Sequence, residues 1–151
     1  MILQIGGAFL AILAFSVVME APRRYLPYCG LVGGAGWFVY LISVDRWGIV
    51  MANFFGALAI SMISHIFARI FKAPVTVFLI PGILTIVPGA ALYRAVYQFF
   101  LGTHSVAAEY LLETIQIAGM IALAIFLIDS LFSILQNTIP PHFYNRFTTK
   151  S

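Results

Sequence analysis

The sequence predicts an all-α protein that crosses a lipid bilayer several times. Of its 151 residues, 62% are hydrophobic and only 9% are charged, whereas a soluble domain carries roughly 25% charged residues. The charged residues are spaced so that long uncharged stretches lie between them. These stretches approach the roughly 20 residues that cross the hydrocarbon core of a membrane. This composition excludes a soluble enzyme.

Five hydrophobic segments follow one another in what we expect to be a single transmembrane domain. The first, at about 2–19, has no Lys or Arg before it, ends at Glu20 and is followed by Arg23 and Arg24. A signal peptide shows the reverse order of charge, so we interpret this segment as a retained span. The other spans are expected at about 27–44, 49–67, 74–100 and 106–135, with 136–151 as a cytoplasmic tail.

The fifth segment carries acidic residues near both of its ends. Glu109 and Glu113 precede a long uncharged run, and Asp129 follows it. At about 1.5 Å per residue, the helix between Glu113 and Asp129 is about 24 Å long, which is close to a membrane thickness. A count of four spans remains open if one early segment does not cross, or if 74–100 enters and leaves by the same face.

The positions of Lys and Arg indicate an orientation, because short cytoplasmic loops are richer in these residues than outside loops. With the N-terminus outside, the outside loops hold only Arg46, which Asp45 offsets, and the other cationic residues that lie outside the spans are on the inside. Those inside are Arg23, Arg24, Arg69, Lys72, Arg146 and Lys150. We therefore expect a multi-pass protein of the cell membrane (plasma or inner membrane). Its N-terminus is expected outside and its C-terminus in the cytoplasm.

Several partners and chemistries are not indicated. The formal net charge of +3 comes from scattered residues, without the cluster of Lys and Arg that would bind a nucleic acid. The single cysteine, Cys29, can form neither an internal disulfide nor a thiolate metal site. No hydrolase, metalloprotease or phosphate-loop motif occurs. We therefore expect no enzyme activity, no metal and no cofactor.

Small residues recur at the spacing of one helical turn in three segments. In a bilayer, such residues let helix backbones approach one another closely. We expect these positions to be helix-packing faces. The pairs are Gly7 with Ala11, Gly30 with Gly34, and Ala118 with Ala122.

Two Pro-Gly pairs, Pro81-Gly82 and Pro88-Gly89, lie inside the fourth segment. Proline removes a backbone donor and clashes with the preceding turn, and glycine permits backbone angles that other residues avoid. Irregular backbone at membrane depth persists only where protein buries it or water wets it. Secondary transporters place such broken helices at their substrate sites. The sequence predicts a broken helix here, which forms either a transport site or a kink absorbed by neighbouring helices.

Arg94 follows the second pair closely, with Tyr93 beside it. A guanidinium group keeps its charge and forms bidentate pairs with carboxylates, so Arg94 is a candidate contact for an anionic substrate group. Two alternatives remain open. Arg94 can extend to a lipid headgroup, or it can pair with Glu109 or Glu113.

Four residues are candidate proton carriers, because ionisable groups inside membrane proteins relay protons. Glu109 and Glu113 lie on one stripe of the last helix, where they can equally form a solvated helix start. Asp129 lies near the opposite membrane face. His65 lies on a small, polar face of the third span and is either a proton acceptor or a packing residue.

The interrupted segment resembles the signature of the threonine/serine exporter (ThrE) family, in its smaller, C-terminal-type half. The resemblance rests on the run APVTVFLIPGI at 73–83, followed by VPGAALY at 87–93. The order of hydrophobic segments is similar over nearly the whole chain. The length is also that of a stand-alone small subunit.

This resemblance implies an integral membrane protein that works with a larger partner subunit of the same exporter family. It implies export of threonine and serine driven by the proton-motive force, or, as in some two-subunit members, of a dicarboxylate such as succinate. The family provides no residue roles that can be transferred. The site residues named above therefore rest on the sequence of this chain.

We interpret the chain as the small subunit of a two-component secondary exporter of small polar metabolites, embedded in the lipid bilayer. Two other interpretations remain open: a non-transporting assembly or scaffold subunit, and a homomeric channel or membrane enzyme. The residues expected to line the pathway are Pro81, Gly82, Pro88, Gly89, Tyr93 and Arg94.

Overall fold

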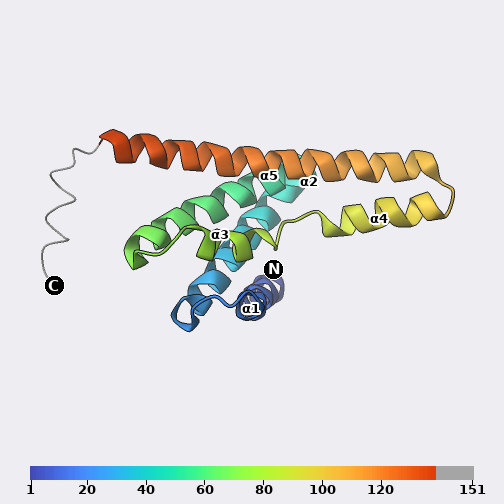
Figure 1. Cartoon of the computed structure of the whole chain (residues 1–151). Coiled ribbons are helices and arrows are strands. Elements are labelled where there is room, and N and C mark those ends of the chain that lie inside the picture. The colour runs from blue at the N-terminus through green and yellow to red at the C-terminus, as the bar shows by residue number, and fades with distance from the viewer. Residues whose placement is uncertain (139–151) are drawn as a thin grey trace, which may run out of the picture.

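The computed structural model describes residues 1–138, with side chains as far as residue 135, and its long elements are helices (Figure 1). This part of the chain contains no strand, so the all-α fold class is confirmed. The predicted tail, 136–151, overlaps the last turn of the final helix at 136–138 and otherwise lies outside the described residues. The elements are α1 (Ile2–Val18), the 3-10 helix η1 (Arg23–Tyr25), α2 (Leu26–Phe71), α3 (Thr76–Ile83), α4 (Gly89–Phe100) and α5 (His104–Thr138).

Two helical stretches, Arg23–Phe71 and His104–Leu135, are long and apolar enough to cross a membrane. α1 is also apolar but shorter, at 17 residues. Large hydrophobic side chains are exposed along α1, α2, α4 and α5. A water-soluble monomer rarely exposes so much contiguous apolar surface, whereas lipid covers it without cost. These features indicate a membrane protein.

α2 contains both the second and the third predicted spans. They are joined at Gly48, whose φ of 75° and ψ of 172° interrupt the helix and change its direction (Figure 1). This backbone region is essentially restricted to glycine. Asp45 and Arg46 lie in helical backbone just before the kink. The prediction of a loop at these two residues is therefore wrong, because one glycine is sufficient to turn the chain.

The fourth predicted segment, 74–100, contains α3, a connection at 84–88, and α4. Its two Pro-Gly pairs occupy different positions. Pro81 and Gly82 lie inside α3, which continues to Ile83. Pro88 is the N-cap residue of α4, which begins one residue later. The first pair therefore does not itself end a helix.

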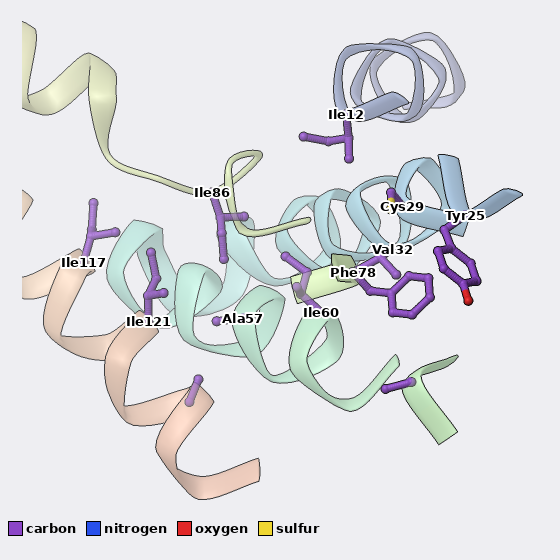
Figure 2. Close-up of a cluster of buried hydrophobic side chains, with 12 residues drawn as sticks. Ile12, Tyr25, Cys29, Val32, Ala57, Ile60, Phe78, Ile86, Ile117 and Ile121 are labelled. Atoms are coloured by element: carbon purple, nitrogen blue, oxygen red, sulfur yellow. The ribbon is translucent and has the colours of Figure 1, made fainter. Parts of the chain in front are cut away.

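A contact from α2 explains why α3 continues through Pro81. Proline has no N–H, so the carbonyl of Val77, four residues earlier, lacks its helical donor. The thiol of Cys29 takes this place and donates to the carbonyl oxygen of Val77, with Sγ 3.3 Å away. Cys29 is completely buried between the helices (Figure 2). A hydrogen bond between helices thus replaces the one that Pro81 cannot make.

Replacing Cys29 with Ala is expected to lower the stability of the bundle, because it leaves the Val77 carbonyl without a donor. Loss of a partner inside a packed interface costs about 1–3 kcal/mol. Cys29→Ser is the matched control, since its hydroxyl is also a donor. Thermal unfolding in detergent should occur at a lower temperature for Cys29→Ala than for Cys29→Ser. Equal unfolding temperatures for both variants and the wild type would show that the thiol hydrogen bond contributes nothing.

The core lies where α1, both halves of α2, α3 and α5 meet (Figure 2). Ile86 belongs to the non-helical connection between α3 and α4, yet its side chain is only 3% exposed. It therefore fixes the connection to the helical core. The other labelled members of the core are Ile12, Tyr25, Cys29, Val32, Ala57, Ile60, Phe78, Ile117 and Ile121.

Glycines let the helices of this core approach closely. A Cβ atom at Gly36 would lie 2.3 Å from Cγ1 of Ile60, in the other half of α2. A Cβ atom at Gly82 would lie 2.7 Å from a γ carbon of a buried valine of α2. Of the predicted pair that faces α1, Gly30 makes a similar close approach, with a Cβ atom 2.8 Å from the ring of Phe9, whereas a Cβ atom at Gly34 would make only ordinary contacts at 3.6 Å or more. At Gly30, Gly36 and Gly82 the absence of a side chain is what allows the packing.

α4 and the first half of α5 form a hairpin that extends away from the core (Figure 1). Within the described residues, α4 packs mainly on α5, whereas the later part of α5 crosses α2. The hairpin carries Arg94, Glu109 and Glu113. The fold therefore separates these three charged residues from the His65 and Asp129 region.

Candidate functional site

The structure brings together two residues that the sequence analysis singled out separately. His65 of α2 and Asp129 of α5 form a hydrogen-bonded pair, with Nε2 of the histidine 2.5 Å from Oδ1 of the aspartate. The side chain of His65 is 11% exposed and that of Asp129 is 52% exposed. The pair is therefore enclosed on the histidine side and open on the aspartate side.

Two neighbours hold the imidazole ring in place. Phe132, one turn after Asp129 on α5, stacks on the His65 ring with 4.5 Å between centroids and an interplanar angle of 4°. The guanidinium carbon of Arg69 lies 4.2 Å from the centroid of the same phenyl ring, and Arg69 also donates a hydrogen bond to the carbonyl of His65. Sequence reasoning missed both neighbours, because only the crossing of α2 and α5 places them here.

Two buried hydroxyl groups extend the polar surface of this pair into the core. Ser61 lies one turn before His65, and Ser64 lies three residues after Ser61. Both serines are fully buried, and their hydroxyl groups have no hydrogen-bond partner among the described residues. The polar face predicted for the third span is therefore directed into the protein.

A histidine hydrogen-bonded to a carboxylate can take up a proton and release it again. Imidazole is the side chain that titrates most readily near neutral pH. The aspartate orients the ring through its hydrogen bond, as a carboxylate does for a catalytic histidine. Ionisable residues on membrane helices are rare, which makes this pair a candidate functional site. This arrangement suits proton transfer.

The remaining charged candidates lie on the α4–α5 hairpin and do not pair with one another. Among residues 1–135, His65–Asp129 is the only pair of acidic and basic side chains within 4.0 Å. Arg94 therefore forms no ion pair with Glu109 or Glu113. The alternative in which Arg94 is neutralised by these glutamates is therefore not observed. Its guanidinium carbon instead lies 5.9 Å from the ring centroid of Tyr110.

The two glutamates differ in their surroundings. Glu109 is exposed, whereas Glu113 is half-buried and interacts electrostatically with Tyr40 of α2. Tyr93 stacks on Tyr97 along the exposed side of α4, with 6.1 Å between ring centroids. Glu113 is thus the acidic residue of the hairpin that faces the bundle.

A cavity of about 550 Å³ lies between α1, α2 and the connection from α3 to α4. Beside residues of α1 and α2, the connection between the two Pro-Gly pairs lines the cavity, and the pairs themselves do not. Pro81 and Gly82 are instead buried in the core, and Gly89 is exposed. None of its lining residues is charged. They include Gln4, Ala8, Phe15, Trp37, Leu84 and Thr85.

Comparison with known proteins identifies the family. The pattern of the family described as "Threonine/Serine exporter, ThrE" matches residues 4–131. The chain is 26% identical over 99 residues to a protein of Mycobacterium tuberculosis (strain ATCC 25618 / H37Rv) named "Probable threonine/serine exporter". This alignment covers 65% of the chain but only 19% of that protein, so the chain spans about a fifth of its relative's length. No solved structure matches the chain significantly.

No set of three or more His, Cys, Asp or Glu side chains that could hold a metal ion occurs among the described residues. The family match covers far more than half of the chain and includes most of α1, all of α2 to α4 and most of α5. The chain belongs to the threonine/serine exporter (ThrE) family.

Proposed function

We propose that this chain is the small membrane subunit of a two-component secondary exporter of threonine, serine or a related small polar metabolite, driven by the proton-motive force. Family membership supports an exporter role. The His65–Asp129 pair is the observation that carries the coupling, since it joins two membrane helices through a group that can bind a proton. In this proposal, export of substrate is coupled to proton entry through this pair.

The proposed partner is a larger subunit of the same family. The relative from Mycobacterium tuberculosis is about five times as long as the part that aligns with this chain. We propose that a separate protein, the larger subunit, supplies the functions that the unaligned part of this relative carries. Five crossings, with the N-terminus outside and the C-terminus in the cytoplasm, would place the cationic Arg69 and Lys72 inside.

The pathway is proposed to follow the non-helical connection between α3 and α4. Irregular backbone at membrane depth is stable where it lines a cavity, and the 550 Å³ cavity borders this connection. Thr85 of the connection donates a hydrogen bond from Oγ1 to the carbonyl of Gly82 at 2.9 Å, which fixes the Thr85 side chain at the start of the connection. Gly89, at the start of α4, has open space around it and is proposed to face the pathway.

Efflux from cells that lack both subunits tests the function. Labelled threonine, serine and succinate should be measured after restoring this chain alone, its presumed larger partner alone, or both together. We expect efflux of threonine and serine only when both are present, and its loss when an uncoupler abolishes the proton gradient.

Each other outcome identifies a rival. Efflux of succinate alone would indicate a dicarboxylate exporter, and efflux with the partner alone would make this chain an accessory subunit. Efflux with this chain alone would indicate a homomeric channel or carrier. Efflux that persists in the presence of an uncoupler would contradict coupling to protons.

A further inference from the structure

We propose that the 550 Å³ cavity between α1, α2 and the α3–α4 connection binds one acyl chain of a membrane lipid. The bound acyl chain would close the lipid-facing side of the connection, so that a polar substrate moving along the connection does not meet the bilayer. This inference goes beyond the proposed function, because it concerns a lipid that is not transported. It requires only that the protein lies in a membrane.

The lining of the cavity is chemically suited to a hydrocarbon chain. Only Gln4, Trp37 and Thr85 of the lining residues carry a nitrogen or oxygen atom in their side chains, and none of the lining residues is charged. The hydroxyl of Thr85 already donates to the carbonyl of Gly82. Gln4 lies in the first turn of α1, where a helix that enters a bilayer meets the polar headgroup region. Most of the lining therefore offers a ligand only apolar contacts.

The backbone of the connection beside the cavity does not need a polar ligand either. The N–H group of Leu84 donates to the carbonyl oxygen of Pro81, with 3.2 Å between nitrogen and oxygen. The N–H group of Thr85 donates to the carbonyl oxygen of Gly82 at 3.3 Å. Hydrocarbon can cover backbone donors that are satisfied in this way without the penalty for an unpaired polar group.

The cavity is wide enough for an acyl chain but too narrow for a helix. Its lining follows α1 from Gln4 to Phe15, which is about 16 Å at about 1.5 Å per residue. Over this length, a volume of 550 Å³ corresponds to a mean cross-section of about 30 Å². An α-helix with its side chains is about 10–12 Å across and therefore needs about 80 Å² or more. An extended hydrocarbon chain is about 4 Å across, because carbon atoms in contact lie about 3.5–4.0 Å apart.

Small residues of α1 keep the cavity open. α1 packs on α2 through residues such as Phe9, which lies against Gly30. Gly7 and Ala11 were predicted to form another helix-packing face, but a Cβ atom built at Gly7 meets nothing within 4 Å. Both residues line the cavity instead. Within the described residues, this pair therefore leaves room beside α1 for a ligand.

Fluorescence quenching by a brominated lipid tests the proposal, because bromine on an acyl chain quenches a tryptophan that the acyl chain contacts. The protein has two tryptophans, Trp37 in the lining of the cavity and Trp47 outside it. In Trp47→Phe, the remaining tryptophan fluorescence therefore reports on the cavity. We expect this fluorescence to be strongly quenched in vesicles of phosphatidylcholine with dibrominated acyl chains, compared with vesicles of unbrominated phosphatidylcholine.

Two glycine variants separate an acyl chain inside the cavity from the bulk lipid around α1. Gly7→Leu fills the cavity, whereas Gly6→Leu, the matched control, adds the same side chain at a residue outside the lining. A Cβ atom built at either glycine meets nothing within 4 Å, so both variants are accommodated. We expect Gly7→Leu to lose most of the quenching of Trp37 and Gly6→Leu to retain it. In Trp37→Phe, the fluorescence comes from Trp47, which is 61% exposed, and its quenching should not change when Gly7→Leu is added.

Two results would overturn the proposal. Absence of quenching in Trp47→Phe would show that no acyl chain contacts Trp37. Equal quenching in Gly7→Leu and Gly6→Leu would show that the quenching lipid lies outside the cavity. Neither readout depends on transport, so failure of the proposed exporter function would leave this test unaffected.

A helix of the larger subunit is the rival occupant of the cavity, and cross-linking in cells that produce both subunits distinguishes the two. The cells should be supplied with a photoreactive fatty acid that enters their membrane lipids. After illumination, we expect a lipid adduct on Leu84 or Thr85, detected by mass spectrometry of peptides, and its loss in Gly7→Leu but not in Gly6→Leu. If lipid adducts form elsewhere on the wild-type protein but not on these two residues, the cavity of the complex is closed to lipid and the proposal is wrong.

Discussion

Replacing Asp129 with Asn is expected to abolish net export while leaving the protein folded and inserted. Asparagine keeps the shape and a hydrogen-bonding group for Nε2 of His65 but cannot carry a negative charge. A positioned proton-transfer group contributes about 10²-fold or more to a rate that depends on it. We therefore expect the initial rate of net threonine efflux to fall by about a hundredfold.

Exchange transport separates the coupling step from substrate binding. When labelled threonine inside the cell exchanges for unlabelled threonine outside, the substrate can move in both directions without net proton movement. We expect Asp129→Asn to retain exchange and to lose net efflux, and His65→Gln to behave in the same way. Loss of both activities at normal protein abundance would mean that the pair serves substrate passage. Normal net efflux in both variants would remove the pair from the mechanism.

Valine substitutions at the glycines of the two Pro-Gly pairs are expected to have opposite consequences. A Cβ atom at Gly82 would lie 2.7 Å from Cγ1 of Val32 and 3.0 Å from Cγ2 of Ile60, both of which are fully buried. Overpacking of this kind costs roughly 1–3 kcal/mol, and the branched side chain of valine adds further atoms. Gly82→Val should therefore reduce the abundance and the unfolding temperature of the protein.

Gly89 provides the contrasting case. No atom lies within 4 Å of a Cβ built at this residue, so Gly89→Val is accommodated within this chain. We expect normal membrane insertion but no export, because a branched side chain would project from the start of α4 into the proposed pathway. Abundance on immunoblots, unfolding temperature in detergent and threonine efflux should be measured for both variants. Full transport by Gly89→Val would exclude the start of α4 from the pathway.

The fold class and most helix positions were predictable from the sequence, because long uncharged stretches leave few alternatives to membrane helices. The continuity of the helices was less predictable. The segments before and after Gly48 were expected to be joined by a loop, and the structure joins them directly by a kink at this glycine. Hydrophobicity does not distinguish a loop from a kink at one glycine.

The behaviour of Pro81 shows why local rules failed in α3. Proline removes a helical hydrogen bond wherever it stands, and this predicts a break. The helix continues because Cys29, 48 residues earlier in the sequence, donates to the freed carbonyl of Val77. No feature of the sequence near Pro81 indicates this donor.

The candidate site was predictable as a set of residues but not as an arrangement. His65, Asp129, Arg94 and Glu113 were singled out because ionisable groups are rare in apolar helices. Their sequence positions do not show that His65 lies 2.5 Å from Asp129, or that Arg94 lies beside Tyr110 without an ion pair to Glu109 or Glu113. The stacking of Phe132 on His65 was missed, because an aromatic residue in a membrane helix is unremarkable without knowledge of its neighbours.

By itself, the sequence determined that this protein is helical, that it suits a membrane, and which few ionisable groups can carry its chemistry. These properties follow from composition and from the spacing of charged residues, and both can be evaluated for each helix by itself. The tertiary structure alone decided which of these groups meet. Pairing depends on how helices cross, and the crossings are set by contacts between distant residues, such as Gly36 with Ile60 and Cys29 with Val77.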